Sequence, residues 1–224
     1  MPDCPELVRV DGVGDGGKPL FVGRYELLWH EYYQSVVEAG CPPPANSDGT
    51  VLDYDPGRED RYPITSIKPI YIECYLKWLR AKTGKAYRLP YEREWKKIAS
   101  ASGVADEDTV GNYPERKAFL RNEYETIPSN FYDRRRVVKL RVIAPVGGKL
   151  GDKIGLYDLV GNLSEMTMDL PENAKTKFPK HSAIALKGGG LASQESNSKI
   201  LSGFEITYSK ANNSFVGYRV IRED

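Results

Sequence analysis

The feature that most constrains this chain is a glycine run followed by a long polar segment near the C-terminus. Lys187–Gly190 leads into Leu191–Phe215, where serine and asparagine are frequent, and the chain then continues through Val216–Val220. This pattern predicts polar loops between short strands for the last part of the chain. Because binding residues concentrate in loops that a rigid scaffold holds, we expect a binding surface in this segment.

Hydrophobic spacing predicts three helices in the first half of the chain. The first starts near Trp29 and stops at Gly40, the second covers residues 69–83 and stops at Gly84, and the third opens at Pro90. The side chains that we expect to face the core are Trp29, Tyr33, Val36, Val37, Ile72, Tyr75, Leu76, Leu79, Trp95, Ile98 and Ala99.

The remaining sequence predicts loops and short strands, which makes the fold class α+β. Residues 41–62 are rich in proline, glycine, asparagine and aspartate and read as a long surface loop, and after about residue 103 short apolar pieces alternate with glycines. No linker or internal repeat divides the sequence. We therefore expect one domain over residues 1–224, with residues 1–20 as an edge strand or arm.

Charge and cysteine content exclude several kinds of protein. The net charge of +1 over 224 residues gives no field for a polyanion, so we expect no nucleic-acid partner, and the basic run Arg134–Arg136 is more typical of a solvated face. Cys4, Cys41 and Cys74 form no C-x-x-C pair, so we expect free thiols and neither a zinc site nor a disulfide framework. No segment resembles a secretory signal or a membrane span, which predicts a cytoplasmic protein, although a virion-associated or specially exported one would look the same.

Two further motifs carry a family resemblance. Gly84–Trp95, GKAYRLPYEREW, is similar to the TGKxYRLPTEAEW motif of the formylglycine-generating enzyme (sulfatase-modifying factor) family, and Gly155–Glu165, GLYDLVGNLSE, is similar to its GLYDMxGNVWEW motif. The glycine run and the Val216–Val220 stretch resemble the Gly-Gly-Ser start and Gly-Phe-Arg end of its C-terminal signature. The resemblance covers nearly the whole chain and implies the C-type-lectin-like fold of that family, with few regular strands and long loops.

The resemblance also implies that the family's oxidase chemistry is absent. Aligned residue by residue, Ser193 and Ser198 stand where the family has its two reactive cysteines. Copper(I) selects soft thiolate ligands, and a serine hydroxyl is neither soft nor ionised near neutral pH. We therefore expect no copper and no catalytic residue. Ser164 and Met166 also stand where the family has tryptophans.

A calcium site is implied by the same resemblance. Asn162, Leu163 and Glu165 combine an amide, a backbone carbonyl and a carboxylate, the hard oxygen ligands that calcium prefers. The alternative is that Glu165 is paired with another group inside a tight loop, because a buried carboxylate needs a partner.

The leading hypothesis is a noncatalytic family member that binds a protein or a small ligand through its C-terminal loops, as in relatives that retroelements diversify, often in phages or their hosts. The alternatives are an enzyme with other chemistry, such as non-haem iron or biosynthetic maturation, and a structural component of a larger assembly. Amide, hydroxyl and aromatic side chains supply adaptable contacts. The candidate ligand-binding residues are Ser193, Gln194, Glu195, Asn197, Ser198, Phe204, Tyr208, Asn212 and Asn213.

Overall fold

The fold is a mixed α+β arrangement, as the sequence predicts. The computed structural model describes residues 4–46, 48–104, 143–147, 152–168, 183–189, 204–207 and 216–224. Its helices are α1 (Trp29–Ala39), α2 (Pro56–Glu59), α3 (Pro69–Thr83) and α4 (Glu92–Ser102). Its strands are β1 (Leu7–Val10), β2 (Leu20–Gly23), β3 (Ala86–Arg88), β4 (Ser164–Met166), β5 (Ala183–Lys187), β6 (Phe204–Thr207), β7 (Val216–Gly217) and β8 (Ile221–Glu223).

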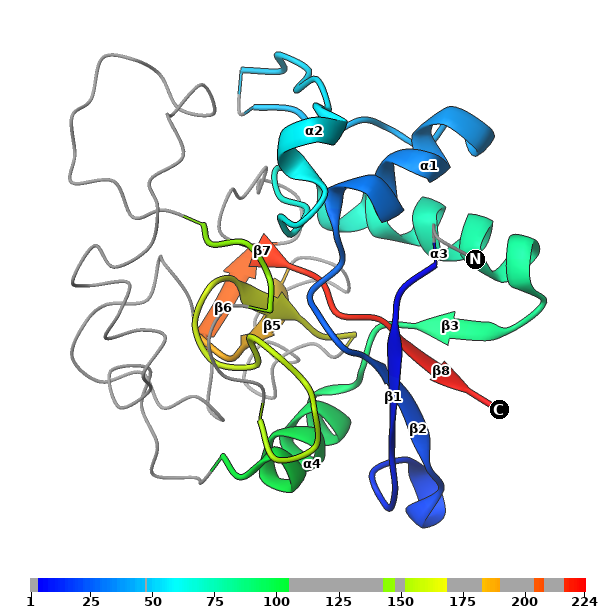
Figure 1. The fold of residues 1–224 in the computed structure, drawn as a ribbon, viewed down its shortest axis with the longest axis vertical. Helices are drawn as coiled ribbons and strands as arrows, with labels where there is room; N and C mark the ends of the chain where they lie inside the picture. The colour runs from blue at the N-terminus through cyan, green and yellow to red at the C-terminus, as the bar shows by residue number, and fades with distance from the viewer. Residues whose placement is uncertain are drawn as a thin grey trace.

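Two small sheets meet at the C-terminal end of the chain. One has the strand order β1-β2-β8-β3 and is antiparallel, and the other has the order β6-β5-β4-β7, in which β4 and β7 run parallel. Strand β7 belongs to the second sheet and β8, the next strand along the chain, to the first, so residues 216–223 join the two sheets (Figure 1). Strand β1 lies at the edge of its sheet, within the residues 1–20 for which the sequence predicts an edge strand or arm.

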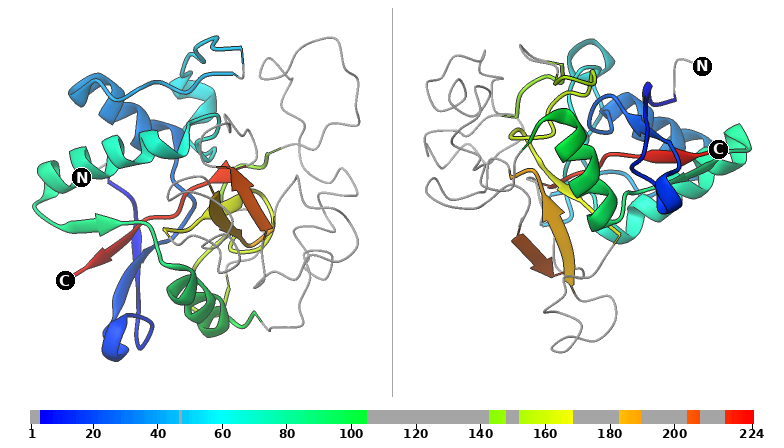
Figure 2. Two further views of the ribbon diagram at one scale, coloured as in Figure 1. Left: turned by 180° about the vertical axis from the view of Figure 1, so that it is seen from behind. Right: turned by 90° about the horizontal axis from the view of Figure 1, so that it is seen from below.

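Apolar side chains form two clusters. The first joins α1 and α3 to the second sheet and includes Trp29, Tyr32, Tyr75, Met166 and Val216. In the second cluster, Trp95, Ile98 and Ala99 of α4 pack with side chains of the first sheet, such as Val22 of β2 and Ile221 of β8. Figures 1 and 2 show α1 and α3 together, with α4 on the far side of the strands.

The helices largely follow the sequence predictions. Helix α3 has the predicted bounds and buries the four predicted side chains, and α4 begins at Glu92, two residues after Pro90. For α1 the predicted face was partly wrong, because Val37 is 68% exposed. Polar residues take part of the buried face: the Ser35 hydroxyl donates to the Tyr32 carbonyl, and Glu31 accepts the Leu28 N–H. Hydrophobic spacing cannot detect buried groups that are hydrogen-bonded in this way.

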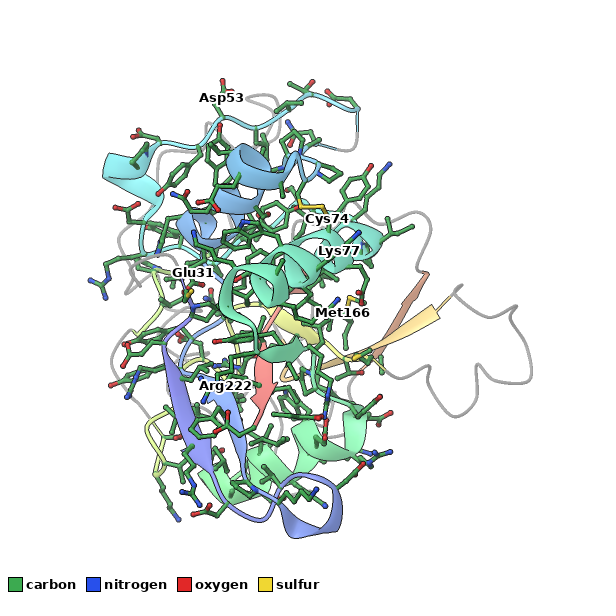
Figure 3. All side chains as sticks on the ribbon, turned by 90° about the vertical axis from the view of Figure 1, so that its right-hand side faces the viewer. Glu31, Asp53, Cys74, Lys77, Met166 and Arg222 are labelled. Carbon is green, nitrogen blue, oxygen red and sulfur yellow. A yellow bond between two sulfur atoms is a disulfide. The ribbon has the colours of Figure 1, made fainter. Side chains whose placement is uncertain are left out.

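The cysteine prediction was wrong. Cys41, two residues after the end of α1, forms a disulfide with Cys74 in the second turn of α3 (Figure 3). Their Cα atoms are 5.7 Å apart. Their sequence separation of 33 hides this proximity. Cys4 is partly buried and takes no part in a disulfide. Helix α2 was also not predicted within the 41–62 loop.

None of the helices among the described residues has the length and apolar composition that a bilayer span requires.

Glu31 is a carboxyl group buried between α1 and α3. Its side chain accepts one backbone hydrogen bond, from Leu28 N at 2.9 Å, and the residue is 5% exposed. Burial raises the pKa of Glu31 to about 8, against the opposing effect of the Leu28 N–H. A raised carboxyl pKa means that the folded protein holds this proton more tightly than the unfolded chain.

We therefore predict that stability falls as pH rises through the window between the ordinary glutamate pKa and about 8. The slope from this one group is on the order of 1 kcal/mol per pH unit. Glu31→Gln keeps the acceptor for Leu28 and removes the titration, so it should flatten this slope and raise stability at pH 7. Urea unfolding between pH 5 and 8 measures it. The exposed Glu73→Gln is the control, and an unchanged slope in Glu31→Gln would contradict the assignment.

Candidate functional site

Both ends of the polar C-terminal segment are held beside one residue of β4. Glu165 stands opposite Lys187 of β5 on one side and opposite Gly217 of β7 on the other. Lys187 is the last residue of β5 before the glycine run, and Gly217 ends β7 just after Phe215. The short strand β4 therefore sets the position of both ends of the segment that the sequence marks for binding.

A buried ion pair fixes the C-terminal end of the segment. Arg219 is 1% exposed and Glu165 is 0% exposed, and Arg219 Nε donates to Glu165 Oε1 at 2.8 Å. The other carboxylate oxygen accepts the indole N–H of Trp95 at 2.6 Å. Arg219 also donates to the carbonyls of Gly23, Arg24 and Tyr157. The guanidinium thus contacts β2 and the residues before β4, and Glu165 links the pair to Trp95 of α4.

Two more acidic groups surround this pair. Burial raises the pKa of Glu26 well above its ordinary value, and the charges of Asp158 and Glu165 add to this effect. Burial likewise raises the pKa of Asp158. On its own, burial would lower the pKa of Arg219, but Glu165, Glu26 and Asp158 raise it. The acidic groups therefore favour the charged form of Arg219, while burial makes ionisation of Glu26 and Asp158 less favourable.

A second buried cation lies at the start of the segment. The Lys187 side chain is 2% exposed and pairs with Glu92 at 2.7 Å, at the first residue of α4. Burial would raise the pKa of Glu92, but the ion pairs with Lys187 and Lys96 lower it. Helix α4 is therefore tied to the sheet twice, through Glu92 to Lys187 and through Trp95 to Glu165.

Two glycines of the motifs are explained by close contacts. Gly188 has φ of +80°, and a Cβ atom there would lie 2.5 Å from the Leu159 carbonyl oxygen. At Gly217 a Cβ atom would lie 2.9 Å from Leu163 Cβ and 3.4 Å from Glu26 Oε1. A side chain at either position would push the segment's ends away from β4.

The predicted calcium ligands lie together, but their side-chain oxygens are already hydrogen-bonded. Asn162 Oδ1 accepts the Ala144 N–H at 3.0 Å, its amide nitrogen donates to Glu26 at 2.7 Å, and Glu165 is held by Arg219 and Trp95. Leu163 N–H donates to Glu26 at 3.1 Å. In this arrangement the side chains do not offer free oxygens to an ion. Within the described segments, no group of three or more His, Cys, Asp or Glu is placed to hold a metal.

The predicted binding residues fall mainly outside the described segments. Phe204 begins β6, opposite Leu186 of β5. The others lie outside the description: Ser193, Gln194, Glu195, Asn197, Ser198, Tyr208, Asn212 and Asn213. The basic run Arg134–Arg136 lies outside it as well.

Sequence reasoning missed Glu26, Asp158, Lys187 and Glu92 as parts of the site. Lys187, Glu92 and Asp158 lie inside the three motifs, which was the available signal. Glu26 lies in none of them, and only the folded chain brings it to Asn162.

Comparison with known proteins identifies the family model that the chain matches and solved structures with a similar fold. A family model described as a sulfatase-modifying factor enzyme 1-like domain matches residues 18–224. Among solved structures, PvdO from Pseudomonas aeruginosa is similar with a TM-score of 0.68 and 20% identity, covering 100% of this chain and 96% of that one. CarF is similar with a TM-score of 0.66 and 17% identity, covering 99% of both chains.

Treponema denticola variable protein 1 is also similar, with a TM-score of 0.63 and 17% identity over 97% of this chain and 95% of that one. At these identities the likeness is one of fold. Comparison with curated proteins finds no match.

We predict that Arg219→Met destabilises the protein by about 3–5 kcal/mol, because it leaves the Glu165 carboxylate buried without its charge partner. Adding Glu165→Gln to that variant should recover part of the loss, since the two residues are coupled. The exposed Arg9→Met, which loses only a surface pair with Asp11, should cost about 0.5 kcal/mol or less. Urea unfolding measures all three, and equal costs at Arg219 and Arg9 would contradict the buried pair.

Chelation provides a separate measurement at the same place. Because Arg219 and Trp95 already occupy the Glu165 oxygens, we expect EDTA to leave the melting temperature of the purified protein unchanged. Calcium that binds only the folded state would stabilise it, so its removal would lower that temperature. A fall in melting temperature, with about one calcium per chain by elemental analysis, would instead support the calcium prediction made from the sequence.

Proposed function

The chain belongs to the sulfatase-modifying factor enzyme 1-like family, and on that premise we propose that it is a noncatalytic member that binds a partner through Leu191–Phe215. The observation that carries the proposal is Ser193 and Ser198 at the positions of the family's reactive thiols. Two alcohols cannot hold copper(I) in place of two thiolates. The oxidase reaction of the family is therefore not expected of this chain.

The framework around the segment supports a binding role. Lys187 and Glu92 hold its start, while Arg219 and Glu165 hold its end, and all four belong to the described and buried or partly buried part of the molecule. A segment with anchored ends can change its sequence while the scaffold keeps its stability, which is what binding loops require. The name of the T. denticola variable protein indicates that a protein of this fold can vary, which favours the same role here.

The composition of the segment favours a polar partner. Glutamine, asparagine, serine and aromatic residues give adaptable hydrogen bonds together with contact area, as in other recognition loops. We propose that the partner is a protein surface or a glycan.

The absence of oxidase chemistry is tested with a sulfatase-type cysteine peptide. We predict no aldehyde product by mass spectrometry, with or without copper, and no stoichiometric copper in the protein. The double variant Ser193→Cys/Ser198→Cys should gain binding of about one copper(I), because it restores the two soft ligands. Aldehyde product from the unmodified protein would overturn the proposal. A double variant that binds no copper would contradict the alignment of the two serines.

The binding surface is tested by group substitution. A glycan array and a protein pull-down identify a partner, and Gln194, Asn197, Tyr208 and Asn212 are then changed together to alanine. We predict that this variant loses at least tenfold in affinity at an unchanged melting temperature. The control changes four exposed framework residues, Asp11, Lys18, Glu73 and Lys77, to alanine and should bind normally. Unchanged affinity in the first variant, or an equal loss in the control, would overturn the assignment of this segment.

A further inference from the structure

The disulfide between Cys41 and Cys74 is built into the way that α1 meets α3. Cys41 follows Gly40, whose left-handed backbone ends α1, and its N–H donates to the Ser35 carbonyl at 3.1 Å. The next residue is held as well, because the Tyr32 hydroxyl donates to the Pro42 carbonyl at 2.7 Å. The chain leaving α1 is thus fixed against its own helix. This brings Cys41 within the Cα separation that a disulfide needs, 5.7 Å from Cys74.

The surroundings of the pair indicate a structural bond. Cys41 is 1% exposed, which hinders attack by an external thiolate. Thiols kept for metal binding need further ligands, and the part of the chain that the structure describes has no suitable group of His, Cys, Asp or Glu. A cysteine pair in an intracellular protein is more often a metal or catalytic pair, so a buried disulfide points to another environment.

The bond also closes a part of the chain that has little other regular structure. Between Cys41 and the start of α3 the described residues contain only the four-residue helix α2 and isolated bridges such as Ala45 with Val51. Closing a long loop removes conformational freedom from the unfolded chain and so stabilises the folded state. The packing of Tyr32 on Tyr75, with ring centroids 5.8 Å apart, lies beside this cross-link.

We infer that the protein completes its fold in an oxidising compartment and meets its partner there. The cytosol keeps thiols reduced, whereas disulfides form and persist in the periplasm, at the cell surface and outside the cell. The first statement rests on the Cys41–Cys74 bond alone and replaces the cytoplasmic expectation from the sequence. The statement about the partner rests in addition on the proposed function.

Thiol trapping in cells that produce the protein naturally is the decisive experiment. The cells are denatured in acid and then alkylated with N-ethylmaleimide in denaturant, because Cys41 is buried in the folded chain. The chain is then examined by mass spectrometry without reduction. We expect one label per chain, on Cys4, and two further labels when the protein is reduced before alkylation. Three labels on the chain without reduction would overturn the inference. Binding is not measured, so failure of the proposed function cannot produce either result.

Melting of the purified protein tests whether the bond supports the fold. Reduction should lower the melting temperature by about 10 °C. The control Cys4→Ser should show the same fall in melting temperature on reduction. The double variant Cys41→Ser/Cys74→Ser should melt at the lower temperature whether or not reductant is present. If that double variant does not fold, the reduced and oxidised melts of the unmodified protein and of Cys4→Ser carry the test. A melting temperature unchanged after verified reduction would overturn the structural role of the bond.

Discussion

The pairing of Arg219 with Glu165 is the interaction on which the rest of this structure depends. A buried ion pair is tolerated only when its geometry is good and its remaining donors and acceptors are satisfied. Here the guanidinium is satisfied by carbonyls from β2, from the residue after it and from Tyr157, and the carboxylate by the indole of Trp95. Satisfying one pair of charges therefore places β2, β4, α4 and the end of the chain together.

The contacts of this pair explain why an arginine suits position 219. A lysine at position 219 would lack the planar fork that donates to Glu165 and to backbone carbonyls at once. Burial raises the pKa of both Glu26 and Asp158, so the ionised form of each is less favourable here than in water. Members of both apolar clusters adjoin these charges, because Trp95 of the second cluster donates to Glu165 and Met166 of the first follows Glu165 in β4.

Sequence reasoning succeeded where one local pattern determines the outcome. Helix α3 was predicted with its bounds and its buried face, because apolar residues recur at helical spacing between Pro69 and Gly84. It failed where the outcome depends on distant contacts. Val37 is exposed because hydrogen-bonded Ser35 and Glu31 take part of the buried face, and the disulfide joins residues that no spacing rule connects. At the site the motifs located Glu165 and Arg219, but their pairing across 54 residues needed the folded chain.

The position of Glu165 between two strands has a consequence for protein engineering. Lys187 and Gly217 are its neighbours on either side, so the two ends of the intervening segment are separated by two inter-strand spacings, or roughly 10 Å. The entropy of closing a loop grows only slowly with its length. The segment between β5 and β7 can therefore be replaced by foreign peptides of different lengths, provided that the two ends of each peptide can approach to that distance.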